Sequence, residues 1–214
     1  LEAVLSDEPP AADLAAERFP LKPGLLTVAA SAAADRIARS FSALSCSAFF
    51  HEMSPHRIKF IVHMAAETHV DNSIAEPVSF IRNNIESTVS MLEYTRKLQQ
   101  RGCDLKAFFY FSTDEVFGPA LGSTMYEEWD RHKPTNPYSS SKSAAENICI
   151  SYQNTYRVPL MIVNVMNAFG ERQHPEKFIP KCISKVLRGE KVYIHSYPDK
   201  QRAGTRFYIH ARNI

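Results

Sequence analysis

From Arg57 onward, short β-branched or aromatic runs alternate with long stretches of helical periodicity. This alternation predicts repeated strand–helix–strand units, which form a parallel sheet. The predicted strands cover residues 58–64, 107–112 and 159–165, with a possible fourth at 191–196. The predicted helices cover residues 77–100, 137–156 and 178–187. The expected fold class is α/β, a Rossmann-like parallel sheet flanked by helices, with ligands at the carboxyl edge of the sheet.

The two longest predicted helices each have one face suited to packing. Pro77 suits the first turn of helix 77–100, and Gly102 suits the position just past its end. The residues expected on the buried face of this helix are spaced at steps of three and four: Val78, Ile81, Ile85, Thr88 and Leu92. One side of helix 137–156 is lined by Tyr138, Lys142, Ala145, Cys149 and Tyr152.

Residues 1–55 differ from the rest, because they are rich in Ala, Ser and Pro and have weak periodicity. Between Leu21 and Phe50 the single acidic residue is Asp35, a composition that resembles an organelle transit peptide. A local amphipathic helix and non-native sequence are the alternatives for this stretch. The chain begins with Leu rather than Met, which suggests a fragment or a processed chain.

Composition argues against several classes of partner. The formal net charge is +2, with 25 basic and 23 acidic residues that are scattered, so we expect no nucleic-acid binding. No apolar run approaches the roughly 20 residues that span a bilayer, so we expect no membrane segment. The four cysteines lie far apart without ligand spacing, which predicts reduced thiols in a cytoplasmic compartment and no bound metal.

Tyr138 and Lys142 stand four residues apart at the start of a predicted helix, so both side chains project from one face. A phenol is a poor base at its ordinary pKa of about 10, and a neighbouring ammonium group favours the phenolate. The pair therefore suits proton transfer at a hydroxyl group whose carbon loses a hydride. Taken alone, such a pair also occurs on solvated helix faces.

A second polar group follows the predicted strand 107–112. Thr113, Asp114 and Glu115 come directly after Ser112, at the edge where parallel sheets present catalytic groups. A helix cap or a solvated loop is the alternative for two consecutive carboxylates. Because Tyr138 follows by about one crossover, the strand end and the helix start can converge on one pocket.

Four motifs occur in this order along the chain: AAETHVDNS at 65–73, STDEVFG at 112–118, NPYSSSK at 136–142 and QHPEKFIP at 173–180. Together with Asn84 and Phe169-Gly170 they resemble the dTDP-glucose 4,6-dehydratase family of extended short-chain dehydrogenases. The resemblance covers residues 57–214. It implies a partial NAD-binding catalytic domain at 56–214, which includes the start of a substrate-binding region, beside the atypical segment 1–55.

The resemblance implies a role for each catalytic candidate. Tyr138 would take the C4 hydroxyl proton while NAD accepts a hydride, and Lys142 would hold the nicotinamide ribose and lower the Tyr138 pKa. Thr113 would hydrogen-bond near the C4 oxygen. Glu115 would remove the C5 proton, and Asp114 would protonate the departing C6 hydroxyl. Eliminating water needs an acid and a base on adjacent carbons, and sibling epimerases usually lack this carboxylate pair.

The resemblance also implies binding residues. Those expected to contact the cofactor, besides Tyr138 and Lys142, are Ala65, Ala66, Thr68 and Ser112. Those expected to contact the nucleotide-sugar substrate are His69, Asn167, Glu176, Lys177 and Arg206. His69 is expected as an indirect contact, and Asn84 is expected to brace the backbone near the site. In full length, the family implies a homodimer through helices 77–100 and 137–156.

The chain departs from the family pattern where a glycine-rich turn would meet the pyrophosphate of the dinucleotide. Its single glycine before Gly102 is Gly24, so the first strand–helix–strand unit is expected to be missing or replaced and the substrate domain truncated. Asn164, Ala168 and Asn213 replace common family residues. The main hypothesis is a dTDP-glucose 4,6-dehydratase that is impaired in this chain. The alternatives are a UDP-glucose 4,6-dehydratase, an NAD-dependent epimerase and a non-catalytic degenerate domain.

Overall fold

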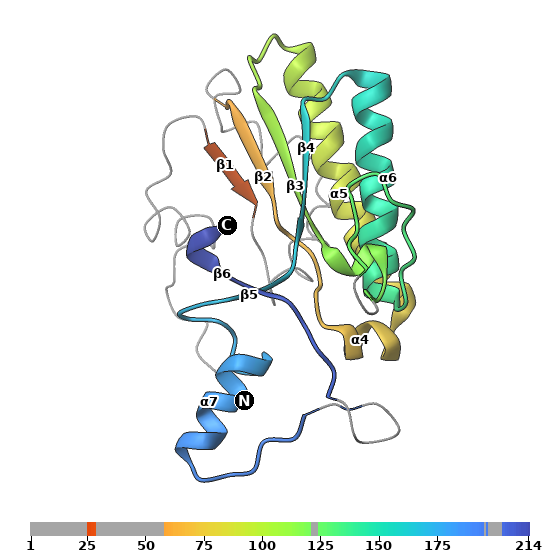
Figure 1. Ribbon diagram of the computed structural model, residues 1–214. Helices are drawn as coiled ribbons and strands as arrows, with labels where there is room; N and C mark the ends of the chain where they lie inside the picture. Colours follow the sequence, from red (N-terminus) through yellow and green to blue (C-terminus); the bar gives the residue numbers. More distant parts are fainter. Residues whose placement is uncertain (1–24, 29–57, 121–123, 195, 197–202) are drawn as a thin grey trace.

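The computed structural model describes residues 25–28, 58–120, 124–194, 196 and 203–214, and at 25–28 it describes the backbone only. Its main sheet has four parallel strands in the order β1-β2-β3-β4. They are β1 (Leu25–Val28), β2 (Phe60–His63), β3 (Ala107–Thr113) and β4 (Leu160–Val165). Helices α5 (Pro77–Gln100) and α6 (Pro137–Tyr156) pack side by side over one face of this sheet (Figure 1). The predicted α/β fold with a parallel sheet is confirmed.

Strand β1 corrects the interpretation of the first 55 residues, for which we expected no strand. Its Leu-Leu-Thr-Val run pairs in parallel with β2, with Leu25 opposite Phe60 and Val28 opposite His63. A short apolar run with β-branched residues suits a strand once a neighbour offers its backbone groups. The remainder of the stretch 21–50, including the predicted transit-like composition, lies outside the described residues.

The core lies between the sheet and the two long helices. Its members include Ile61 from β2, Phe108 and Tyr110 from β3, Leu92 from α5 and Cys149 from α6, each at most 1% exposed. Burying side chains of this size contributes roughly 1.5–3 kcal/mol each before the entropy cost. This packing fixes the carboxyl ends of β2 and β3 relative to the start of α6.

Helix α5 has the predicted bounds but a different buried face. Thr88 and Leu92 are buried as expected, whereas Val78 is 77% exposed. The observed buried face is made of Phe80, Asn84, Thr88, Met91, Leu92, Tyr94, Thr95 and Leu98. Several of these side chains are polar and are buried because they hydrogen-bond, so the predicted spacing identified only part of the buried face.

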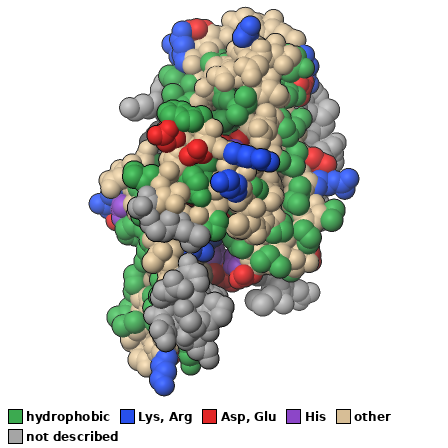
Figure 2. All heavy atoms as spheres, turned by 45° about the vertical axis from the view of Figure 1, so that its right-hand side comes forward, with side chains coloured by type: hydrophobic (Ala, Val, Ile, Leu, Met, Phe, Trp, Pro, Cys, Tyr) green, Lys and Arg blue, Asp and Glu red, His purple; other side chains and the backbone are tan. Residues whose placement is uncertain are grey.

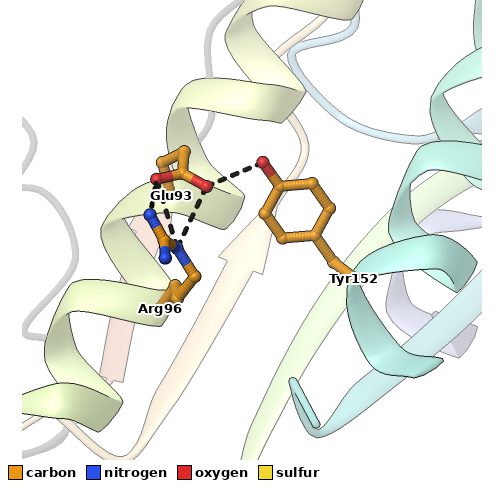
Figure 3. A network of polar contacts seen from close by, with 3 residues as sticks. All are labelled: Glu93, Arg96 and Tyr152. Atoms are coloured by element: carbon orange, nitrogen blue, oxygen red, sulfur yellow. Dashed lines mark hydrogen bonds and ion pairs between the residues drawn. The ribbon is translucent and has the colours of Figure 1, made fainter. Parts of the chain in front are cut away.

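A polar network joins the outer sides of α5 and α6 (Figure 3). The Tyr152 hydroxyl on α6 donates to Glu93 Oε1 on α5 at 2.8 Å, and Arg96 Nη2 donates to Glu93 Oε2 at 2.7 Å. Arg96 also lies over the Tyr156 ring at 5.1 Å. The network fastens the two helices at the end away from Tyr138.

The remaining described elements lie around this core. They are α4 (Val70–Ala75), the 3₁₀ turns η2 (Asp114–Phe117) and η3 (Ala211–Asn213), helix α7 (Phe178–Leu187) and the parallel pair β5 (Asn167–Phe169) and β6 (Tyr208–His210). The predicted strand at 191–196 is wrong in its described part. Residues 191–194 form no strand, and Ser196 makes an isolated bridge with Ala203. No helix in the described part of the chain is long and apolar enough to cross a membrane.

Candidate active site

Strand β3 carries the polar residues of the site to its carboxyl end. Ser112 and Thr113 are buried there, and the chain turns at once into η2, which begins with Asp114 and Glu115. Thr113 caps this turn because its Oγ1 accepts from the Glu115 amide at 3.3 Å. The same hydroxyl lies 3.3 Å from Asp114 Oδ1. One threonine at the strand end therefore contacts both the Asp114 carboxylate and the Glu115 backbone.

Helix α6 brings Tyr138 to the same place. The helix begins with a capping box, in which Asn136 Oδ1 accepts from the Ser139 amide at 2.8 Å and the Ser139 hydroxyl lies 3.3 Å from the Asn136 amide. Asn136 Nδ2 also donates to Glu115 Oε2 at 3.2 Å. One residue thus fixes both the start of the helix and the Glu115 carboxylate.

The Tyr138 hydroxyl is partnered by Thr113, and its ring meets Phe80 edge-on at 6.3 Å between centroids. Burial raises the pKa of Tyr138 to about 12, and the hydrogen bond from Thr113 opposes this rise. The charges of Glu115 and Asp114 add to the rise. The bond from Asn136 to Glu115 brings the start of α6, and with it Tyr138, to the carboxyl end of β3.

Lys142 lies one turn farther along α6 and is 3% exposed. Its Nζ donates to the Phe111 carbonyl at 2.5 Å and lies 4.3 Å above the Tyr110 ring. Burial lowers the pKa of Lys142 to about 8, while the carboxylate of Glu146 opposes the fall. The amine bonds to β3, and the pKa of Tyr138 is raised, so the expected depression of the Tyr138 pKa by Lys142 is not present.

Asp114 is the carboxyl group whose protonated form is favoured. Burial raises its pKa, the Thr113 hydroxyl opposes that rise, and the Glu115 charge adds to it. A carboxyl group with a raised pKa retains its proton to higher pH, which is the property of a general acid. Burial thus favours the acid form of Asp114 relative to an exposed carboxyl group.

Asn84 on α5 ties the end of β2 to α6, as expected from the sequence. Its Oδ1 accepts from the Glu67 amide at 2.8 Å, and its Nδ2 donates to the Glu67 carbonyl at 3.1 Å and to Ser141 Oγ at 2.9 Å. The side chain is 1% exposed. Asn84 therefore braces three elements around the pocket.

The other residues predicted to contact a cofactor surround the ends of β2 and β3. Ala65 and Ala66 are buried just after β2, and Ser112 is buried one residue before Thr113. Thr68 is exposed, and its Oγ1 lies 3.4 Å from Lys177 Nζ. Small buried side chains at a strand end leave room for a ligand to approach the backbone closely.

The residues predicted to contact a substrate are spread more widely. Lys177 caps α7 and reaches Thr68, which joins the α7 region to the end of β2. Asn167 donates to the Phe207 carbonyl at 3.3 Å, and Arg206 donates to the neighbouring Thr205 carbonyl at 2.9 Å. His69 lies at the start of α4, and its Nδ1 is buried. Glu176 is exposed and lies just before α7. No described contact joins any of these five residues to Tyr138, Asp114 or Glu115.

Three residues with contacts in the site were not identified from the sequence. Asn136 holds Glu115, Ser141 holds Asn84, and Glu146 lies buried behind Lys142. Glu146 had a usable signal, because its spacing of four from Lys142 places it on the same helix face. The bond from Asn136 to Glu115 spans 21 residues and has no local sequence signal.

Comparison with known proteins adds the family to this geometry. A model described as GDP-mannose 4,6 dehydratase matches residues 47–213. The chain belongs to this family. The predicted resemblance to nucleotide-sugar 4,6-dehydratases is thereby confirmed, and the match begins about ten residues before the boundary expected from the motifs.

Two curated members of this dehydratase family are similar to the chain over most of its length. The dTDP-D-glucose 4,6-dehydratase of Dictyostelium discoideum is 36% identical over 168 residues, which are 74% of this chain and 37% of that protein. The dTDP-glucose 4,6-dehydratase of Neisseria gonorrhoeae is 38% identical over 145 residues, which are 65% of this chain and 42% of that protein.

A solved structure agrees with the fold. DesIV, a dTDP-glucose 4,6-dehydratase from Streptomyces venezuelae crystallised with NAD, is 28% identical and superposes with a TM-score of 0.68. The match covers 82% of this chain and 49% of DesIV. The chain therefore spans less than half the length of each of these dehydratases.

Proposed function

We propose that the site performs the chemistry of a nucleotide-sugar 4,6-dehydratase, converting dTDP-glucose to dTDP-4-keto-6-deoxyglucose. The observation that supports the proposal is the bond from Asn136, at the start of the helix that carries Tyr138, to Glu115, which follows Thr113 and Asp114 at the end of β3. A hexose ring placed there would have its C4 oxygen beside Tyr138 and its C5 and C6 positions beside the carboxylates. The two dTDP-glucose dehydratases at 36% and 38% identity support this substrate class.

The first chemical task belongs to Tyr138 and Thr113. Tyr138 accepts the C4 hydroxyl proton, and Thr113 orients the C4 oxygen through the hydroxyl that already partners Tyr138. Because burial raises the Tyr138 pKa to about 12, the phenol needs positive charge nearby to act as a base at neutral pH. The buried Lys142 amine, one helical turn away, is the cationic group that the chain offers.

The second task, loss of water, belongs to the carboxyl pair. Once C4 is a ketone, the C5 proton is acidic, and Glu115 removes it. Asp114, whose pKa is raised by burial, protonates the C6 hydroxyl so that it leaves as water. Both side chains extend from η2, so acid and base reach adjacent carbons of one ring.

The residues fit one half of an NAD molecule. Lys142 and Tyr138 would hold the nicotinamide ribose, and the buried Ala65 and Ala66 leave the end of β2 open to close approach. When bound, NAD supplies a hydride acceptor for C4 and a hydride donor for C6. The sequence has a single glycine, Gly24, before Gly102, so it offers no glycine-rich turn for the pyrophosphate. The grip on the dinucleotide is therefore expected to be weak.

Assembly through α5 and α6 is a further part of the proposal. Figure 2 shows the side of the molecule that carries these helices, where acidic and basic side chains lie among hydrophobic ones. Ile150 and Tyr156 on α6 are 40% and 43% exposed. We place the homodimer contact of a full-length form on this face, and a light-scattering mass of one subunit for such a form would contradict it.

The thiols fit the expected compartment. Among the described cysteines, Cys149 is a buried thiol and Cys182 is a half-buried one, and neither forms a disulfide. Burial raises the pKa of Cys149 to about 12, which keeps that thiol protonated and unreactive. We place the protein in the cytoplasm, and recovery of an oxidised chain from cells would argue against this.

Calorimetric titration of the purified chain with NAD and with nicotinamide mononucleotide tests the proposed cofactor site. We expect both ligands to bind weakly and with similar affinity, because the chain offers contacts to the nicotinamide half. Lys142→Met is expected to abolish both signals, whereas Lys181→Met on exposed α7 leaves them unchanged. NAD binding at micromolar concentration, far tighter than binding of the mononucleotide, would show that the chain also binds the rest of the dinucleotide. Binding that is unchanged in Lys142→Met would contradict the assigned site.

A further inference from the structure

A buried carboxyl group lies one helical turn beyond Lys142. Glu146 on α6 is 4% exposed, and its spacing of four residues places it on the same helix face as Lys142. The proposed mechanism assigns Glu146 no role. Burying a carboxyl group costs several kcal/mol unless it is hydrogen-bonded or paired with a positive charge.

Groups from two other parts of the chain hold the carboxyl oxygens of Glu146. From β4, Asn164 Nδ2 donates to Oε1 at 2.9 Å. From the segment before α6, His132 Nε2 lies 3.4 Å from Oε2. His132 is itself held by Ser143, whose Oγ lies 2.8 Å from Nδ1, and by the Phe117 ring at 5.3 Å. The carboxyl group is therefore fixed on both oxygens.

These partners leave the charge of Glu146 available to Lys142. Asn164 is a neutral amide, so it satisfies an oxygen without cancelling the charge, and His132 carries charge only when protonated. The Glu146 carboxylate raises the pKa of Lys142 against burial. Burial raises the pKa of Glu146, and that rise is opposed first by the hydrogen bond with Ser112 and then by the charge of His132, the hydrogen bond with Asn164 and the charge of Lys142.

The other titratable groups around this pair are uncharged at neutral pH. Burial raises the pKa values of the Cys149 thiol on α6 and the Tyr110 phenol on β3, and lowers that of the His63 imidazole on β2. Glu146 is therefore the negative charge that acts on the buried amine, and its removal would leave Lys142 facing neutral side chains.

We propose that Glu146 is a positioning residue for Lys142: its carboxylate, held by Asn164 and His132, keeps the buried amine charged beside Tyr138. A charged amine at this position, one helical turn from Tyr138, attracts an electron-rich ribose oxygen. The inference rests on the proposed function for the use of Lys142, but the charge of Lys142 is measurable without any catalytic activity.

The test is an NMR titration of the purified chain labelled with [13Cε]lysine, in which the Lys142 signal is assigned by its loss in Lys142→Arg. We expect Glu146→Gln to lower the Lys142 pKa by about one unit or more, the size expected for a neighbouring opposite charge. Glu146→Asp, which retains the charge, is expected to restore most of the shift. Glu93→Gln is the matched control, because Glu93 contacts Arg96 and Tyr152 at the far end of α6.

A Lys142 pKa that is the same in Glu146→Gln as in the unmodified chain overturns the proposal. The unmodified chain provides a second readout if the variant does not fold. Its Lys142 signal is expected to show an additional small inflection at the pH where the Glu146 carboxyl carbon titrates, and two independent titrations would contradict the coupling. Neither result depends on NAD binding, so failure of the dehydratase proposal remains distinguishable.

Discussion

At the scale of single residues, burial acts in opposite directions on the two groups that the helix presents together. It raises the pKa of Tyr138 to about 12 and lowers that of Lys142 to about 8, so each group is driven toward its neutral form. Tyr138 can act as a base, and Lys142 can carry a positive charge, only where other charges oppose the effect of burial on their pKa values. The Glu146 carboxylate opposes burial in this way at Lys142.

A buried histidine makes a separate prediction about acid stability. His63 is 1% exposed, its Nε2 lies 3.1 Å from Thr88 Oγ1, and its pKa is lowered from 6.5 to about 3, chiefly by burial and then by Lys142. Because the folded-state pKa lies below the unfolded value, the unfolded chain binds more protons between these pH values. Stability contributed by neutral His63 is therefore present above pH 6.5 and is lost as pH falls toward 3.

Urea unfolding at pH 7 and pH 4 measures this effect. Linkage predicts that His63 alone lowers the free energy of unfolding by about 3 kcal/mol between these conditions. In His63→Gln the acid-induced loss should be smaller by about that amount, whereas His174→Gln, in an exposed loop, should behave as the unmodified chain. An unchanged pH dependence in His63→Gln would contradict the neutral buried state.

At the scale of elements, the turn that follows the two carboxylates depends on one glycine. Gly118 ends η2 with φ of +87°, and a Cβ there would lie 2.6 Å from the Lys133 carbonyl oxygen. Gly102 after α5 has a similar φ of +76° but open space around it. A side chain added at either position would strain the left-handed backbone, but only at Gly118 would it also clash with a neighbouring atom.

Gly118→Ala is consequently expected to be the more destabilising of two matched substitutions. Both variants should lose about 1 kcal/mol from backbone strain, and Gly118→Ala should lose about 1–3 kcal/mol more because the Lys133 backbone must shift. Denaturant unfolding of both proteins gives the comparison. Equal losses of unfolding free energy in the two variants would mean that the Lys133 backbone shifts without an energetic cost, which would contradict this expectation.

The elements also show why some features were readable from the sequence and others were not. The bounds of α5, α6 and α7 were predicted because proline, glycine and capping residues mark helix ends locally. The buried face of α5 was predicted only in part, since Asn84 is buried through its bond to the distant Glu67. Strand β1 depends on pairing with β2, about 30 residues away, so its four residues carried little signal of their own.

At the scale of the whole molecule, the sheet brings together residues that are far apart in the chain. Thr113 from β3, Tyr138 from α6 and Asn84 from α5 are placed around one pocket by the parallel order of the strands and the two helices packed on them. Motif order predicted that the end of β3 and the start of α6 lie together, which the bond from Asn136 to Glu115 confirms, while the catalytic roles of their residues stay a prediction. The predicted substrate residues lie in exposed segments around α7 and β6, and their convergence on the pocket stays a prediction.

The central claim is that Tyr138, Asp114 and Glu115 act on one hexose ring, and the reaction in deuterated water tests it most directly. The protein is incubated with dTDP-glucose and NAD, and the sugar is analysed by mass spectrometry and NMR. The account predicts a product that has lost one water and carries a single deuterium at C5, with formation abolished in Glu115→Gln and in Tyr138→Phe. Recovery of a sugar inverted at C4 without loss of water, or product formation that survives both substitutions, would contradict it.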